Sequence, residues 1–179
     1  MDTIGGNPEA FAPETLLLPC LERLAQGEPV TPAPVVPRLW GQCAAFYLQR
    51  SATPPPAPRD WAQPVAIEGS RGNPLLRELE TFARDPHARE RRFPAATPQR
   101  SLLHQAIDRA GLDMTHVTER KGRPYTLVCT KTRATHQRAL RRYKRDLADM
   151  RRLLALDAAK ASAAVPVTSR LREALAAAG

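Results

Sequence analysis

Two side chains suited to binding an anion lie four positions apart in a segment with helical character. Arg100 and His104 belong to the run QRSLLHQAIDRAG at residues 99–111. Positions i and i+4 of a helix lie one turn apart and project in nearly the same direction. A guanidinium offers a planar fork of N–H donors that matches a phosphate, and an imidazole adds one or two more. The spacing predicts an outward-facing phosphate clamp beside the apolar face of Leu103 and Ile107.

Asp108 follows His104 by one further helical turn. We expect its carboxylate to accept a hydrogen bond from His104 and to raise the affinity of the imidazole for a proton. The alternative interpretation of the same spacing is structural: Arg100 and His104 only border the core, and Asp108 holds His104 at its edge.

A basic hairpin follows this helix. The runs LDMTHVTER at residues 112–120 and YTLVCTKT at residues 125–132 are rich in β-branched residues, and KGRP at residues 121–124 supplies the turn. A turn centred on Gly122 and Arg123 pairs Thr115 with Thr130, His116 with Cys129, and Val117 with Val128. The more apolar face should pack on the helices; its residues are Leu112, Met114, Leu127 and Cys129.

The elements around this site predict an α+β fold, with a small antiparallel sheet packed on helices. The sheet consists of the hairpin at about residues 112–130, with a candidate third strand at residues 64–69. Asn73 and Pro74 begin a helix that ends near residue 85, and a second helix starts with Thr97 as its cap and Pro98 in its first turn. Gly111 stops that second helix.

The remaining segments flank this core, which we place at residues 64–133. Residues 1–50 should form an N-terminal helical segment, with helices at 13–27 and 35–50, and residues 51–63 a Pro-rich linker. Residues 134–160 should form one long basic helix, and residues 161–179 a flexible tail with a short helix. The long helix has an apolar seam that should pack on the hairpin, on the N-terminal helices or on a second copy; its residues are Leu140, Tyr143, Leu147, Met150 and Leu154.

Positive charge is concentrated in one stretch of the chain. Residues 84–153 contain 18 Lys and Arg against 7 Asp and Glu, a net charge of +11, whereas residues 1–83 contain 6 against 9, a net charge of −3. Such concentration favours a polyanionic partner, because Lys and Arg release counterions from a phosphate backbone. The alternative interpretation of this charge is a solvated basic surface that serves only solubility.

Composition also argues against several classes of protein. Three widely spaced cysteines predict neither a disulfide framework nor a zinc site, and His116 opposite Cys129 falls short of a zinc ligand set. The chain shows no acid/base pair of carboxylates, no Gly-rich phosphate loop and no cofactor motif, so we expect neither an enzyme nor a bound metal. No leader peptide or membrane-spanning run is recognisable, and the sequence predicts a cytoplasmic, bacterial protein.

The order of motifs carries a resemblance to a known family. Arg100-x-x-x-His104 is followed by Gly111-Leu112, a strand, a basic turn with a glycine and a strand that ends near Lys131. This arrangement, over about residues 75–133, resembles the single-stranded nucleic-acid-binding domain family named for its Arg-x-x-x-His signature. The resemblance implies a small α/β module in which Arg100 and His104 take the signature roles and Arg123 and Lys131 lie near further basic positions.

Two alternatives remain open at this stage. Helices followed by a hairpin also resemble a winged-helix DNA-binding regulator, with the helix at 98–110 in the major groove and the basic hairpin tip as the wing. The winged-helix fold needs a further helix before the one at 98–110. The segment available for it, PHARERR at residues 86–92, has almost no apolar residues to pack. In the second alternative the chain is a scaffold subunit of a larger, nucleoprotein assembly, with a protein partner on the N-terminal helices or on the seam at residues 140–154.

We therefore expect a non-catalytic protein that binds nucleic acid, with single-stranded DNA or RNA favoured and duplex DNA as the alternative. Tyr125 is the only aromatic residue near the turn, which predicts little base stacking and weak sequence preference. The predicted contacts come from the helix pair, the hairpin, the chain after it and the long helix. They are Arg100, His104, Arg120, Lys121, Arg123, Lys131, Arg133, Arg138, Arg141, Arg142 and Arg145.

Overall fold

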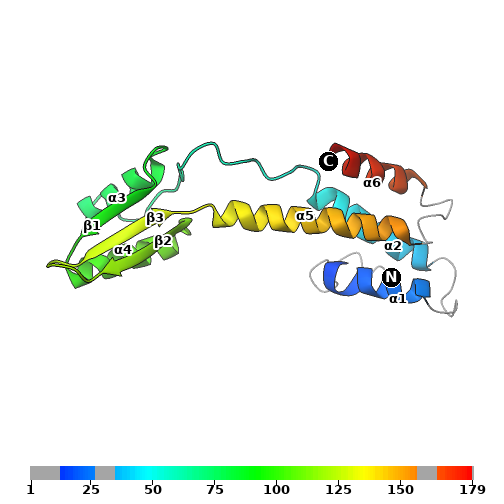
Figure 1. The fold of residues 1–179 in the computed structure, drawn as a ribbon, viewed down its shortest axis with the longest axis horizontal. Helices are drawn as coiled ribbons and strands as arrows, with labels where there is room; N and C mark the ends of the chain where they lie inside the picture. The colour runs from blue at the N-terminus through cyan, green and yellow to red at the C-terminus, as the bar shows by residue number, and fades with distance from the viewer. Residues whose placement is uncertain (1–12, 27–34, 157–164, 179) are drawn as a thin grey trace. The chain divides into compact units, whose positions relative to one another are not determined.

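A computed structural model describes residues 13–26, 35–156 and 165–178. The chain divides into two compact units. Residues 56–138 form a unit with the sheet, and residues 1–55 together with 139–179 form a helical unit (Figure 1). The expected α+β class is confirmed.

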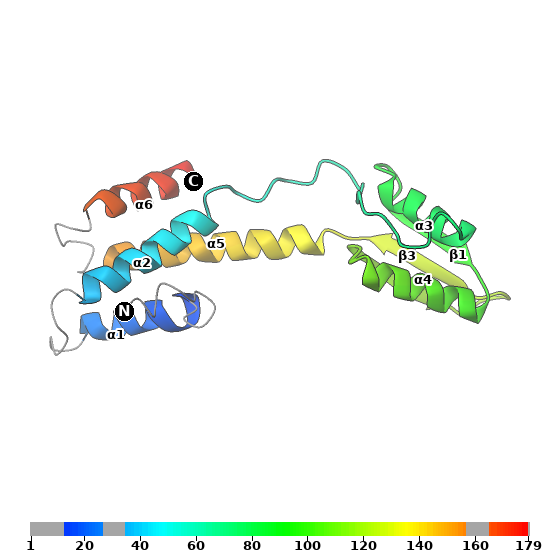
Figure 2. The same cartoon turned by 180° about the vertical axis from the view of Figure 1, so that it is seen from behind.

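The sheet unit combines two helices with three antiparallel strands. In chain order these are α3 (Pro74–Arg84), β1 (Glu90–Pro94), α4 (Thr97–Arg109), β2 (Met114–Glu119) and β3 (Thr126–Lys131). The strand order is β1-β3-β2, so β3 lies in the middle. Both helices lie on the same face of the sheet (Figure 2). The buried side chains of Phe93, Leu127 and Cys129 fill the space between the helices and the sheet.

The predicted hairpin register is confirmed. Thr115 pairs with Thr130, His116 with Cys129, and Val117 with Val128. The face with Met114, Leu127 and Cys129 is buried under the helices, as the alternation of apolar residues predicts. Gly122 has a φ of +75°, a conformation that glycine adopts without steric cost, so its position in the turn is also explained.

The predicted third strand is wrong in position. Residues 64–69 form no strand, and β1 at Glu90–Pro94 completes the sheet instead. Ile67 is still buried in the core, but its N–H donates to the Glu80 side chain rather than to a neighbouring strand. Only Phe93 of β1 is buried, so this strand has no apolar alternation that could be recognised. β1 includes residues 90–92 of the PHARERR segment. The extra helix that a winged-helix fold requires is therefore not formed there.

The predicted N-cap of α3 is confirmed, and the N-cap of α4 lies one residue before the predicted position. The Asn73 side chain accepts hydrogen bonds from the N–H groups of Leu75 and Leu76, as predicted. Thr97 is the first residue of α4 and not its cap; the cap position is Ala96, whose N–H donates to the Gln99 side chain. The Thr97 hydroxyl instead accepts a hydrogen bond from Arg100.

The helical unit contains the π-helix η1 (Pro13–Leu17), α1 (Leu18–Gln26), α2 (Val35–Arg50), α6 (Val165–Ala177) and most of α5 (Ala134–Ala155). The predicted seam of α5 packs against the N-terminal helices. Leu147 and Met150 are buried there, together with Leu18, Trp40 and Tyr47. The indole N–H of Trp40 donates to the carbonyl of Leu153, 2.9 Å away. Most of the seam is therefore covered within the chain, and the predicted separate segments share one core.

Asp146 anchors this core electrostatically, and its replacement should destabilise the unit. Its carboxylate, 1% exposed, accepts hydrogen bonds from Arg50 and Ser51. We expect Asp146→Ala to lower the free energy of unfolding by about 3 kcal/mol, because the partly buried Arg50 guanidinium loses its main partner.

Urea unfolding followed by Trp40 fluorescence in a Trp61→Phe background isolates the helical unit, because Trp40 lies in that unit and Trp61 in the other. Glu173→Ala, at an exposed position of α6, is the control and should change the free energy by less than about 0.5 kcal/mol. Equal stability of the Asp146→Ala variant and the parent would contradict this assignment.

Candidate nucleic-acid interface

Arg100 does not face solvent as predicted. Its side chain is 9% exposed, and the guanidinium donates to the Ala95 carbonyl at 2.5 Å and to the Thr97 hydroxyl at 3.1 Å. The guanidinium carbon also lies 5.3 Å from the ring centroid of Tyr125, which leads into β3. Arg100 thus joins the start of α4 to the hairpin. The helical spacing placed it at the edge of the core, but Tyr125 covers that edge.

His104 turns toward the sheet and meets a second histidine. Its Nδ1 lies 2.5 Å from Nδ1 of His116 on β2, and the two ring centroids are 4.7 Å apart. Between two Nδ1 atoms at this distance only one proton fits, so one ring donates and the other accepts. Asp108 lies 3.4 Å from Nε2 of His116 and does not hold His104, contrary to expectation.

The protonation of His104 is disfavoured in this position. Burial lowers the pKa of His104 below its usual 6.5, and the neighbouring His116 and Arg100 lower it further, whereas Asp108 opposes them. This direction is opposite to the higher proton affinity that the sequence predicts. The predicted clamp is therefore wrong in geometry: Arg100 and His104 have separate partners within the protein and do not present donors together.

Lys131 and Arg133 are also engaged inside the sheet unit. Lys131 is 0% exposed; its ammonium donates to the Asp85 carbonyl at 2.6 Å and lies 4.7 Å from the ring centroid of Phe82. Burial lowers its pKa. The half-buried Arg133 stacks on Trp61 at 4.4 Å, where it helps hold the linker on the core. Lys131 is therefore not free to bind a phosphate, whereas Arg133 is held against Trp61 and keeps part of its surface exposed.

The hairpin tip keeps the cationic character that the sequence predicts. Arg120, Lys121 and Arg123 are exposed, and within the described ranges none of them makes an ion pair or a side-chain hydrogen bond. Glu119, the carboxylate nearest to them in sequence, is paired with Arg92 on β1. The ion pair leaves the positive charge of the tip largely uncompensated.

The outer face of α5 carries a run of exposed cations without ion pairs among the described residues. Asp146 and Asp149 are its only carboxylates, and both are buried, at 1% and 4% exposure. Asp149 accepts hydrogen bonds from Tyr47 and Arg152. The exposed cations of the helix with no ion pair in the described part of the chain are Arg138, Arg141, Arg142, Lys144, Arg145 and Arg151. Lys144 and Arg151 were absent from the predicted contacts, although both lie on flanks of the seam.

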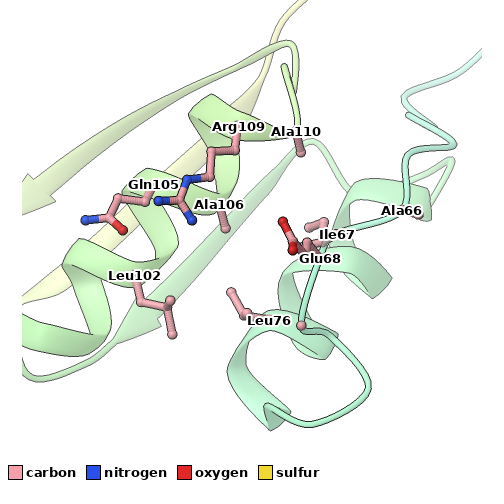
Figure 3. A pocket seen from close by; sticks show the side chains of 10 residues that line it. Ala66, Ile67, Glu68, Leu76, Leu102, Gln105, Ala106, Arg109 and Ala110 are labelled. Atoms are coloured by element: carbon pink, nitrogen blue, oxygen red, sulfur yellow. The ribbon is translucent and has the colours of Figure 1, made fainter.

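A pocket on the helix side of the sheet unit has a different character. It lies between residues 66–69, the start of α3 and α4 (Figure 3). Leu76, Leu102 and Ala106 give it apolar walls, and Glu68 and Arg109 are its charged residues. No histidine, cysteine or hydroxyl side chain lines it. Elsewhere in the described ranges, no group of three His, Cys, Asp or Glu could hold a metal ion.

The structural role of Arg100 can be separated from a binding role. Arg100→Ala leaves the Ala95 carbonyl without its partner, and we expect the unfolding free energy of the sheet unit to fall by about 1–3 kcal/mol. The affinity of the folded variant for an oligonucleotide should change less than about twofold. Urea unfolding and fluorescence anisotropy measure the two effects. A variant that folds as stably as the parent but loses binding would support the predicted phosphate clamp and contradict the structural role.

The histidine pair should make the stability of the sheet unit depend on pH. Because the pKa of His104 is lower in the folded than in the unfolded state, the unfolded chain binds more protons below pH 6.5. The stabilisation is therefore present above pH 6.5 and is lost as the pH falls through the folded pKa. Thermal unfolding between pH 7.5 and 5 should show this loss. It should be reduced in His104→Gln and unchanged in the control His87→Gln; equal pH profiles for the two would contradict the assignment.

No helix in the described ranges is long and apolar enough to cross a membrane. No protein-family model, curated protein or solved structure matches this chain. The function of the chain is therefore inferred from its own geometry and charge.

Proposed function

We propose that the protein binds nucleic acid without catalysis, through contacts from the exposed cations of α5 and of the hairpin tip to phosphates. The observation that carries this proposal is the burial of both carboxylates of α5, which leaves six cations on its outer side without an ion pair in the described ranges. Lys and Arg arranged along a helix neutralise successive phosphates and release counterions.

The chemistry of these contacts favours recognition of the backbone over recognition of bases. Guanidinium and ammonium groups bind phosphate oxygens, which carry no sequence information. Tyr125, the aromatic residue nearest to the tip, is half-buried beside Arg100 and is not free to stack on a base. We expect weak sequence preference. Single-stranded DNA or RNA is our first choice, in keeping with the resemblance of residues 75–133, and duplex DNA is the second.

Removal of three α5 cations should weaken binding and its salt dependence together. In Arg141→Gln/Arg142→Gln/Arg145→Gln, each lost phosphate contact lowers the slope of log affinity against log salt by about 0.7 for a single strand or about 0.9 for a duplex. The affinity at 0.1 M salt should fall at least about tenfold. Fluorescence anisotropy with a labelled oligonucleotide at several salt concentrations measures both quantities.

The matched control is Arg23→Gln/Arg170→Gln/Arg172→Gln. It removes the same charge from exposed positions on α1 and α6. A similar loss in both triple variants would show a general effect of net charge and would refute the assignment to α5. A parent protein that binds neither single-stranded nor duplex oligonucleotides at low salt would refute the function itself.

A further inference from the structure

The pocket between residues 66–69, α3 and α4, which we call the helix-side pocket, has the size of a small-molecule site. Leu102 and Ala106 of α4 form one apolar wall, and Leu76 of α3 contributes to the opposite one (Figure 3). The cavity volume is about 320 Å³, at the lower end of the ~300–1,000 Å³ that is typical of small-molecule sites. The pocket therefore suits a small ligand with an apolar group.

The wall opposite α4 is held in place by hydrogen bonds within the sheet unit. The N–H of Ile67 donates to the Glu80 side chain, and the N–H of Ser70 donates to the Ile67 carbonyl, 3.2 Å away. Gly69 has a φ of +80°, which lets the chain turn there into α3 without steric cost. Because this wall is already formed, a ligand would not have to order it on binding.

Three polar side chains border the apolar interior and have no partners. Glu68 lies on one side of the pocket, and Gln105 and Arg109 lie on the other, one turn of α4 apart (Figure 3). All three are exposed, and in the described ranges none of them makes an ion pair or a side-chain hydrogen bond. The pocket thus offers one carboxylate and one guanidinium on opposite sides of an apolar space.

These two charges determine which ligand fits. A ligand with only a negative charge would pair with Arg109 but would also face Glu68, and a ligand with only a positive charge would meet the reverse problem. A ligand with both charges can pair with both side chains. The amide N–H groups of Gln105 add donors for its carboxylate, and an apolar group on the same molecule is removed from water between the walls.

We propose that the helix-side pocket binds a free α-amino acid with an apolar side chain. The carboxylate of the amino acid pairs with Arg109 and accepts a hydrogen bond from Gln105, and its ammonium pairs with Glu68. Its side chain packs against Leu76 and Ala106. The site shares no residue with the phosphate contacts proposed for α5 and the hairpin tip, so it is independent of the proposed function.

An NMR titration of the full chain with leucine tests this proposal. Millimolar leucine should shift the backbone amides of Gly69, Ala106 and Ala110 in a saturable way, because these residues line the pocket. Glycine has the same two charges but no apolar side chain. It should bind at least about tenfold more weakly than leucine.

Two variants and two leucine analogues identify the charge contacts. Arg109→Gln should weaken leucine binding about three- to tenfold, but it should not weaken the binding of leucinamide, which lacks the carboxylate. Glu68→Gln should weaken leucine binding by a similar factor, but not the binding of N-acetylleucine, which lacks the ammonium. Both positions are exposed, so both variants should fold as the parent does.

The control is Arg59→Gln, which removes a positive charge from an exposed position of the same unit outside the pocket and should bind leucine as the parent does. The other outcomes would overturn the proposal. Absence of saturable shifts, or equal affinities for leucine and glycine, would exclude an amino-acid site. An equal loss in Arg59→Gln, or equal losses of leucine and leucinamide in Arg109→Gln, would exclude the proposed charge contact. Shifts of the same amides on concentration of the protein alone would assign the pocket to a second copy.

Discussion

Asp146 and Asp149 lie on the inner face of a helix whose outer face is almost entirely basic. Arg50 and Ser51 hydrogen-bond to Asp146, while Tyr47 and Arg152 hydrogen-bond to Asp149, so both carboxylates are compensated inside the helical unit. A buried carboxylate without such partners would cost several kcal/mol. The same contacts stabilise the packing of α5 and remove its negative charge from the surface. The cationic face of the helix is therefore a consequence of how the core is built.

The sheet unit depends on a similar division between two faces. Alternation along β3 directs Leu127, Cys129 and Lys131 toward the helices, and for this reason a lysine ends beside Phe82 and the Asp85 carbonyl. The same alternation on β2 turns the His116 ring toward His104 and its backbone groups toward the free edge. The side chain of His116 thus makes a partly buried polar contact, and its main chain lies on an unpaired edge of the sheet.

Local signals predicted much of the fold. The Asn73 cap, the hairpin register and the bounds of α2 follow from patterns within a few residues, and the structure reproduces them. β1 was missed because an edge strand with a single buried side chain has no periodicity to detect. For the site, the exposure of the hairpin tip was predicted, whereas Arg100 and Lys131 were assigned to a surface that they do not reach, and Arg133 is held against Trp61.

The sequence by itself determined the α+β class, the helix and hairpin positions and the concentration of positive charge in residues 84–153. These properties depend on residue type and on spacing along the chain. The tertiary structure decided which cations remain free, because that depends on partners distant in sequence: Tyr125 for Arg100, Asp85 for Lys131, and Asp146 for Arg50. A charged side chain near the edge of a core turns inward where the fold offers a compensating group and outward where it does not.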